Sequence, residues 1–228
     1  MTISIITPTC NRPFGIPLLE KYVAEQSIQP DQWIVADGGS EPALLTMGQQ
    51  HSHVPAAPGG ANLCNNIIRG LREATGEYIF IFEDDDVYYR DHIERNLQRL
   101  MSGNSASGGS ELNYFNVAHR CWVKMKNKGS ALCQTAFHRR LIPLMINAAE
   151  SAKTCKDYGI DTRFWNLCGA QPHNLLTVIG IKGLPGTEGL GIGHRPNSKR
   201  AWVNDPNMTQ LKEWIGHERT EPYRRAYQ

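Results

Sequence analysis

The sequence predicts an α/β fold in which helices flank a mostly parallel sheet. Short apolar runs rich in isoleucine, valine and aromatic residues alternate with segments of helical periodicity through the first half of the chain. These runs lack strict alternation of polar and apolar residues, which is typical of strands buried on both faces. With 228 residues, 40% of them hydrophobic and 20% charged, the chain suits one domain with its own core. We therefore expect residues 1–228 to form a single domain.

Strands and helices are predicted to alternate in the first half of the chain. The expected strands are residues 3–7, 33–36 and 78–82. The expected helices are residues 16–26, residues 62–74 and a third that carries Ile93, Leu97 and Leu100 on one side. Strand–helix–strand repetition predicts right-handed crossovers and a ligand crevice at the carboxyl ends of the strands.

The second half has a mixed pattern. Residues 102–110, SGNSASGGS, predict a flexible linker. The elements expected beyond it are a strand over 131–137, a helix over 141–152, a strand over 175–181, and a helix opened by Asp205 as N-cap and Pro206, with Leu211, Trp214 and Ile215 on one face. The tail from Arg219 onward has no periodicity.

The net charge of +2 hides an uneven distribution. Residues 1–110 carry 7 Lys and Arg against 13 Asp and Glu, a balance of −6, and residues 111–228 carry 17 against 9, a balance of +8. An acidic half joined to a basic half gives information about the charge of the binding partners rather than about the fold. The alternative interpretation is chance clustering of solvated surface charge.

Membrane and secretion signals are absent from the sequence. No apolar run approaches the roughly 20 residues that cross a bilayer, and the first seven residues lack the basic region of a signal peptide. Six scattered cysteines without a C-x-x-C pair predict reduced, mostly buried thiols. We expect a cytoplasmic protein without an integral membrane segment.

Four adjacent carboxylates follow the third predicted strand directly: Glu83, Asp84, Asp85 and Asp86. Neighbouring carboxylates repel each other, so this arrangement costs stability unless a cation compensates it. Oxygen ligands of this kind suit Mg²⁺ or Mn²⁺, and the end of a buried strand would place them in the ligand crevice. The alternative is a solvated acidic turn.

Two other polar segments follow predicted strands. Residues 7–12, TPTCNR, leave the first strand as a loop that could contact a nucleotide. Asp37 ends the second strand before a Gly-Gly pair, either as a turn former or as an acceptor of hydrogen bonds from a base or ribose. Neither a P-loop nor a dinucleotide-binding G-x-G-x-x-G motif occurs after a strand, which disfavours P-loop NTPases and dinucleotide-dependent oxidoreductases.

A glycine-rich stretch over residues 186–193 leads to His194. One interpretation is a mobile loop. The other is a lid whose amides, with Arg195 and Lys199, approach a diphosphate while His194 reaches a metal.

Three of these segments together resemble family 2 glycosyltransferases of the GT-A fold. They are residues 3–12 (ISIITPTCNR), 34–40 (IVADGGS) and 74–86 (ATGEYIFIFEDDD), in the same order as in that family. The resemblance implies a Rossmann-like sheet whose half 1–101 binds a nucleotide-sugar, expected to be a UDP-sugar, with Mn²⁺ or Mg²⁺ held by a D-x-D-type motif. By this resemblance Asp84 and Asp86 hold the metal, with Asp85 as the close rival. It also implies that the nucleotide-sugar contacts Thr7, Thr9, Asn11, Arg12, Asp37, Asp84 and Asp85.

The resemblance is looser in the second half. It implies that Asp161, at a predicted helix start, is the catalytic base and that His194 completes the metal site. The chain departs from the family at Ala61-Asn62, where an Arg-Asn pair that contacts the diphosphate is common. It also lacks the Q-x-x-R-W signature of processive polysaccharide synthases, so a processive synthase is not expected.

These residues predict a metal-dependent, inverting glycosyltransferase that moves a sugar to a hydroxyl group. Arg195 or Lys199 would assist the departing diphosphate. The basic half 111–228 would bind the acceptor, which predicts an anionic one: an acidic glycan, a lipid-phosphate-linked sugar, or DNA with a hydroxymethylated base. Two alternatives are a sugar-phosphate nucleotidyltransferase and a non-catalytic nucleic-acid-binding module, although the latter leaves the acidic cluster unexplained.

Overall fold

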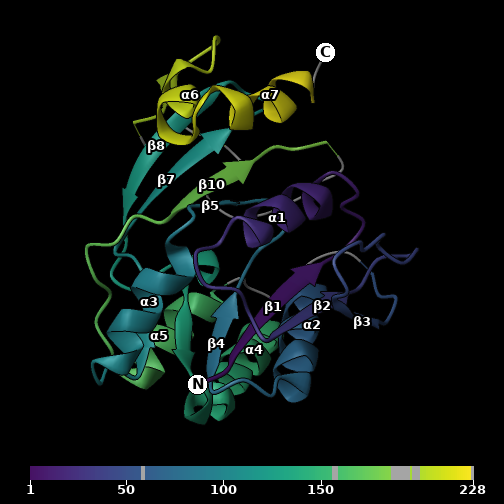
Figure 1. Cartoon of the computed structure of the whole chain (residues 1–228), viewed down its shortest axis with the longest axis vertical. Coiled ribbons are helices and arrows are strands. Elements are labelled where there is room, and N and C mark those ends of the chain that lie inside the picture. Colours follow the sequence, from purple (N-terminus) through teal and green to yellow (C-terminus); the bar gives the residue numbers. More distant parts are fainter. Residues whose placement is uncertain (58–59, 156–158, 186–195, 197–200, 227–228) are drawn as a thin grey trace.

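Two sheets form the centre of this computed structural model, which describes residues 1–57, 60–155, 159–185, 196 and 201–226 (Figure 1). The larger sheet has six strands in the order β3-β2-β1-β4-β9-β6. Its strands are β1 (Ile3–Thr9), β2 (Gln32–Asp37), β3 (Gln50–His53), β4 (Tyr78–Ile81), β6 (Ala106–Ser107) and β9 (Ala136–His138). The first four strands of the order run parallel, and β9 and β6 add antiparallel pairings.

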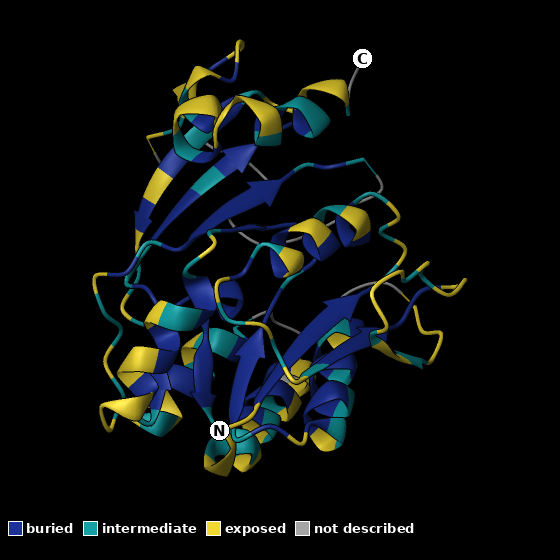
Figure 2. Cartoon of the chain, in the orientation of Figure 1, coloured by how far each residue is buried: buried dark blue, intermediate teal, exposed yellow. Residues whose placement is uncertain are grey.

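Strand β1 lies at the middle of this sheet because it is apolar on both faces. Ile6 pairs with Ile34 of β2 and Ile81 of β4, and all three side chains are fully buried. One face packs against α2 (Gly60–Glu73), α4 (Ile142–Cys155) and α5 (Ile160–Cys168). The other face packs against α1 (Gly15–Ala24) and α3 (His92–Met101). Figure 2 shows the result: buried strands lie between helices whose outer faces are exposed.

The second sheet has five strands in the order β11-β8-β7-β10-β5 and occupies the upper part of Figure 1. Its strands are β5 (Val87–Tyr88), β7 (Glu111–Asn116), β8 (Cys121–Lys126), β10 (Val178–Lys182) and β11 (Val203–Asn204). Helices α6 (Thr209–Ile215) and α7 (His217–Arg225) lie above it. A hydrogen bond of 2.7 Å between the Tyr22 and Tyr223 hydroxyls ties α7 to α1.

The sequence predictions for the first half are confirmed. The three expected strands form β1, β2 and β4, and the three expected helices form α1, α2 and α3, with boundaries shifted by a few residues. In the second half, the helix expected over 141–152 is α4, which tolerates Pro143 in its first turn because that position needs no amide donor.

Several predictions for the second half are wrong. The expected linker 102–110 contains β6, whose small residues are buried against β9. The strand expected over 131–137 is a short 3₁₀ turn, Leu132–Gln134, followed by β9. The tail without periodicity contains α7, and the β7–β8 hairpin was not predicted. In the first half, β3 was not predicted either. Tertiary pairing, rather than local pattern, selects the structure of these segments.

Two further expectations concern helix starts and cysteines. Asp205 acts before α6 as predicted, accepting hydrogen bonds from the amides of Thr209 and Gln210 at 2.8 Å, although the regular helix begins only at Thr209. The five cysteines whose side chains the structure describes are free thiols, three of them buried. Across the described ranges, no helix combines the length and apolar character needed to cross a bilayer.

Candidate active site

The acidic turn that follows β4 is held rigidly at the meeting point of the two sheets. Phe82 continues from β4 and stacks on Tyr88 of β5, with the ring centroids 3.9 Å apart and the planes 2° from parallel. The Tyr88 hydroxyl accepts a hydrogen bond of 2.7 Å from the amide of Glu83. Glu83 is half-buried, and Asp84, Asp85 and Asp86 are buried. The turn is therefore not the solvated acidic loop that the sequence left open.

Asp84 is bound from the side of β1. Its Oδ2 accepts a hydrogen bond of 2.6 Å from the Thr9 hydroxyl, and its Oδ1 lies 2.7 Å from Nη1 of Arg12. The same guanidinium lies 3.4 Å from Asp85. Gly15 allows α1 to begin here, because a Cβ at that position would lie 2.5 Å from the Asp84 carbonyl oxygen. Residues from the first predicted strand and the third therefore form one polar cluster, as the ends of parallel strands should.

Asp86 and Asp85 are bound from the side of β10. The Lys182 ammonium lies 2.9 Å from Asp86 Oδ1 and 3.0 Å from Asp85 Oδ2. The amide of Ile181 donates a further hydrogen bond of 3.0 Å to Asp86 Oδ1. The acidic cluster therefore carries two internal cations, Arg12 on one side and Lys182 on the other.

Burial sets the protonation behaviour of this cluster. It raises the pKa of Glu83 to about 8 and that of Asp86 to about 6, because a buried carboxylate loses its hydration. Burial opposes the charge of Lys182, but Asp85 and Asp86 together hold its pKa well above the ordinary value. Burial also raises the pKa of the Cys133 thiol, which lies near Glu83 and Asp86.

The two loops expected to contact a nucleoside lie against each other. Asn11, in a left-handed conformation with φ of 53°, accepts a hydrogen bond of 2.8 Å from the Ser40 amide. Asp37 is buried, and its carboxylate accepts hydrogen bonds from the amides of Gly39 and Ala43 at 2.7 and 2.8 Å. The buried carboxylate of Asp37 therefore holds the backbone of this loop in its conformation.

Thr7 and Thr9, although both belong to β1, occupy different environments. Thr7 is fully buried, and its hydroxyl accepts a hydrogen bond of 3.0 Å from the indole of Trp33. This contact favours a structural role, so we do not retain Thr7 among the residues proposed to contact a nucleotide. Thr9 bonds to Asp84 and lies within the cluster.

Asp161 lies in the first turn of α5, at the helix start that the sequence predicts. It is half-buried, and its Oδ1 accepts a hydrogen bond of 2.7 Å from the Thr162 amide. Burial raises the pKa of Asp161 above its ordinary value. A carboxylate with a raised pKa is a stronger proton acceptor, which suits a general base. His194, Arg195 and Lys199 lie outside the described residues.

The sequence matches the model of one protein family, glycosyl transferase family 2, over residues 4–167, which is well over half of the chain. The chain belongs to this family. Membership of this family favours the glycosyltransferase expectation over the nucleotidyltransferase and binding-module alternatives. No curated protein matches the chain in sequence.

Solved structures share the fold of this glycosyltransferase. S. aureus TarS 1–349 in complex with UDP-GlcNAc matches with a TM-score of 0.58 and 14% identity, over 86% of this chain and 62% of that one. The crystal structure of S. aureus TarS matches with a TM-score of 0.57 and 14% identity, over 79% of this chain and 37% of that one. The chain thus spans little more than a third of the latter. The single-domain GT-A fold expected from the sequence is confirmed.

The predicted metal pair of this glycosyltransferase, Asp84 and Asp86, does not fit a divalent cation in the arrangement described. Both Asp84 oxygens have donors, and Lys182 provides positive charge beside Asp86 Oδ1, whereas Asp86 Oδ2 is buried without a hydrogen-bond partner among the described residues. The side chain of Asp86 is 0% exposed. Ligand atoms of Glu83, Asp86 and Cys133 lie within 4.8 Å of one another, but a thiol with a raised pKa is a poor partner for Mg²⁺ or Mn²⁺, which prefer oxygen.

Lys182 is the cluster residue that sequence reasoning missed. The expected strand over 175–181 stopped one residue short of it, and strand β10 in fact runs to Lys182. A single lysine that ends an otherwise apolar strand is a signal that could have identified it, because a charge at that position needs a buried partner.

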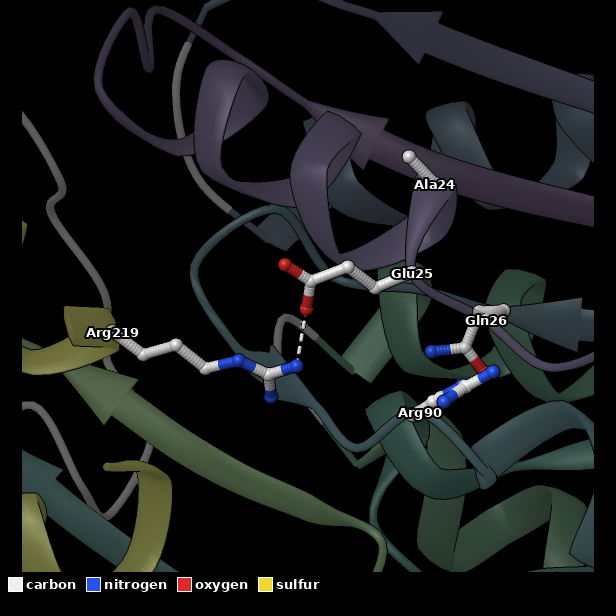
Figure 3. A pocket seen from close by; sticks show the side chains of 5 residues that line it. All are labelled: Ala24, Glu25, Gln26, Arg90 and Arg219. Atoms are coloured by element: carbon white, nitrogen blue, oxygen red, sulfur yellow. Dashed lines mark hydrogen bonds and ion pairs between the residues drawn. The ribbon is translucent and has the colours of Figure 1, made fainter. Parts of the chain in front are cut away.

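An open hollow of about 430 Å³ lies elsewhere, between the carboxyl end of α1 and α7 (Figure 3). Ala24, Glu25, Gln26, Arg90 and Arg219 line it, and Arg219 forms an ion pair with Glu25. None of the predicted site residues lines this hollow. Its contacts attach the C-terminal helix to α1, whose opposite end abuts Asp84.

Proposed function

We propose that this glycosyltransferase transfers a sugar from a UDP-sugar to a hydroxyl group of its acceptor, with inversion at the anomeric carbon. The observation that carries the proposal is the junction of Thr9, Arg12 and Asp84, which joins the loop after β1 to the turn after β4. In sheets of this type, ligands bind beyond the carboxyl ends of the strands. The UDP-GlcNAc bound by TarS, which shares the fold, supports a UDP-sugar as donor.

The donor would lie on the half 1–101. Asn11 and Ser40 close the two loops around the expected nucleoside position, and Asp37 holds the second loop in shape. Arg12 lies beside the acidic turn, and its side chain is 20% exposed, so part of the guanidinium faces outward. It is suited to stabilise the negative charge that develops on the departing diphosphate. Arg195 and Lys199 remain predicted helpers in this role.

Asp161 would act as the general base. The acceptor oxygen attacks the anomeric carbon as the bond from that carbon to the diphosphate oxygen breaks, and the hydroxyl proton passes to Asp161. UDP leaves with the electron pair of the broken bond. Attack from the face opposite the leaving group inverts the anomeric configuration.

Arg12 and Lys182 offset two of the four carboxylate charges of the cluster. Coordination of Mn²⁺ or Mg²⁺ by Asp84, Asp86 and His194 stays a prediction from the sequence.

The acceptor is proposed to bind the half 111–228 and to be anionic. Lys124 and Lys128 are exposed and, within the part of the chain that the structure describes, make no ion pair. Lys124 lies 6.0 Å from the ring of Trp122, a half-buried aromatic on the same strand. Exposed cations beside an aromatic ring suit a phosphate or carboxylate group next to a sugar or base.

A nucleotide-sugar hydrolysis panel tests the donor without knowledge of the acceptor. UDP-glucose, UDP-GlcNAc and UDP-galactose are compared with GDP- and dTDP-sugars, with Mn²⁺ or with EDTA, and release of the nucleoside diphosphate is measured. We expect slow release of UDP from a UDP-sugar and no release of nucleoside diphosphate from the GDP- and dTDP-sugars. Release only from GDP- or dTDP-sugars would refute the uridine assignment, and binding of no nucleotide-sugar at all would refute the donor site.

A further inference from the structure

Lys182 occupies an unusual position for a lysine. It ends β10, its side chain is 9% exposed, and its ammonium lies within 3.0 Å of two buried carboxylates. Lysine is almost never buried to this degree unless it is paired. The pairing joins residues 96 positions apart, and it depends on the antiparallel pairing of β10 with β5, the strand that begins directly after Asp86.

The backbone on both sides fixes this lysine in place. Lys182 pairs with Asn116 in the parallel register of β10 and β7, and its carbonyl accepts a hydrogen bond of 2.8 Å from the Val117 amide. The preceding amide, that of Ile181, donates to the same Asp86 oxygen that the ammonium contacts. The chain then turns away at Gly183, with φ of +71°. A side chain held in this way is a fixed charge rather than a mobile surface cation.

Its ammonium lies between the carboxylates of Asp85 and Asp86, the position that a metal ion bound by these two residues would take. Arg12 lies on the other side of the cluster, against Asp84 and Asp85. A divalent ion entering between Asp85 and Asp86 would have to displace an ammonium already bound to both, and it would leave that cation buried without a partner.

We infer that Lys182 is the resident cation of the donor site, supplying the positive charge that lets a nucleoside diphosphate bind beside the acidic cluster without a divalent metal. The inference rests on the proposed function for the nature of the donor. It assigns Lys182 a positioning role: the ammonium offsets part of the negative charge of Asp85 and Asp86, while Arg12, which pairs with Asp84 and Asp85 and is partly exposed, faces the diphosphate. A purely structural ion pair would affect stability alone, whereas this role also determines the metal dependence of nucleotide binding.

The test compares three forms of the full chain: wild type, Lys182→Met and the matched control Lys21→Met, which removes an exposed lysine from α1. UDP affinity is measured by calorimetry with EDTA and with Mn²⁺. Mn²⁺ binding is measured separately, from the loss of the free-ion EPR signal as protein is added without nucleotide. Should Lys182→Met fail to fold, Lys182→Arg, which keeps the charge, is compared with wild type in the same assays.

We expect wild type and Lys21→Met to bind UDP in EDTA within about threefold of their affinity in Mn²⁺. Neither protein should reduce the EPR signal of free Mn²⁺. Lys182→Met should bind UDP about tenfold more weakly in EDTA, deplete the Mn²⁺ signal, and recover affinity when Mn²⁺ is added. Lys182→Arg should behave as wild type.

Depletion of the Mn²⁺ signal by wild type, with UDP binding only in Mn²⁺, would overturn the inference. Equal UDP affinities of wild type and Lys182→Met in EDTA would do the same. If no form binds UDP under any condition, the proposed donor fails, and the Mn²⁺ signal of wild type against Lys182→Met still decides whether Lys182 holds the cation position.

Discussion

The six-stranded and five-stranded regions differ in how deeply their charged side chains are buried. At the carboxyl ends of β1, β2 and β4 the charged groups are buried, and donors held by the fold surround Asp37 and Asp84. In the five-stranded region, the cations on β8 are exposed, and Lys182 at the end of β10 is a buried exception. A buried charge is tolerated only when it is paired, whereas an exposed charge costs little. In the proposed function, the first region would hold the donor in one geometry, and the second would present positive charge to the acceptor.

Lys182 connects the two regions. It comes from the five-stranded sheet and ends in the acidic cluster of the six-stranded sheet. The contact pairs a lysine of the half 111–228, whose charge balance is +8, with two aspartates of the half 1–110, whose charge balance is −6.

Replacing the proposed base should remove catalysis and leave the donor region intact. Asp161→Asn is expected to lower the transfer rate about 10²- to 10⁴-fold, with unchanged UDP affinity, because the amide cannot accept the acceptor proton. In wild type, burial raises the pKa of Asp161, so the rate should fall with decreasing pH as this carboxylate becomes protonated. Asp91→Asn, at the exposed start of α3, is the control. Unchanged turnover of Asp161→Asn would remove this residue from the base role.

Acid should weaken the junction between the regions through His92. This histidine is buried among Phe80, Phe82 and Tyr88, bonds to Thr177 at 2.7 Å, and has its pKa lowered by burial from 6.5 to about 3. Between these pH values the unfolded chain binds a proton that the folded chain does not. This group should therefore lower the free energy of unfolding by about 1.4 kcal/mol per unit as pH falls from about 6.5 to about 3.

Chemical denaturation over this pH range measures the effect. His92→Gln keeps a hydrogen-bonding side chain but does not titrate, so its pH slope should be shallower than that of wild type. Equal slopes in the two proteins would show that His92 titrates normally in the fold.

Breaking the paired charges of the donor region should destabilise the fold more than breaking an exposed pair. Arg12→Ala leaves the buried Asp84 carboxylate without its cation, and we expect a loss of about 3 kcal/mol in the free energy of unfolding. Arg95→Ala removes an exposed pair with Asp91 at 3.7 Å, which should cost less than about 0.5 kcal/mol. Urea denaturation compares the two. Equal losses would show that Asp84 does not depend on Arg12.

Removing exposed cations from the second half should change acceptor binding and leave stability almost unchanged. Lys124→Ala and Lys128→Ala are expected to weaken binding of duplex DNA, used here as an anionic probe. Each should also reduce the dependence of log K on log salt by about 0.9 for every phosphate that the variant no longer neutralises. Fluorescence anisotropy measures both effects. Lys21→Ala, on α1 in the donor half, is the control. Absence of binding at low salt would exclude nucleic acid as the acceptor.

Sequence reasoning predicted the first half well because its signals are local. Residues 3–7 and 78–82 are apolar on both faces, and helical periodicity identified α2 and α3. It failed at β6, β9 and α7, where small or polar segments gain their structure by pairing with distant ones. The acidic turn was found because its charges are adjacent in sequence.

The sequence by itself determined the parallel strands, the carboxylates at the end of β4 and the family to which the chain belongs. Each of these depends on residues close together in the chain, where periodicity and composition decide the outcome. Only the tertiary structure decided which cations compensate those carboxylates. Arg12 and Lys182 are 72 and 96 positions away from Asp84 and Asp86. A buried charge selects its partner by the packing of the sheets, and sequence spacing does not encode that choice.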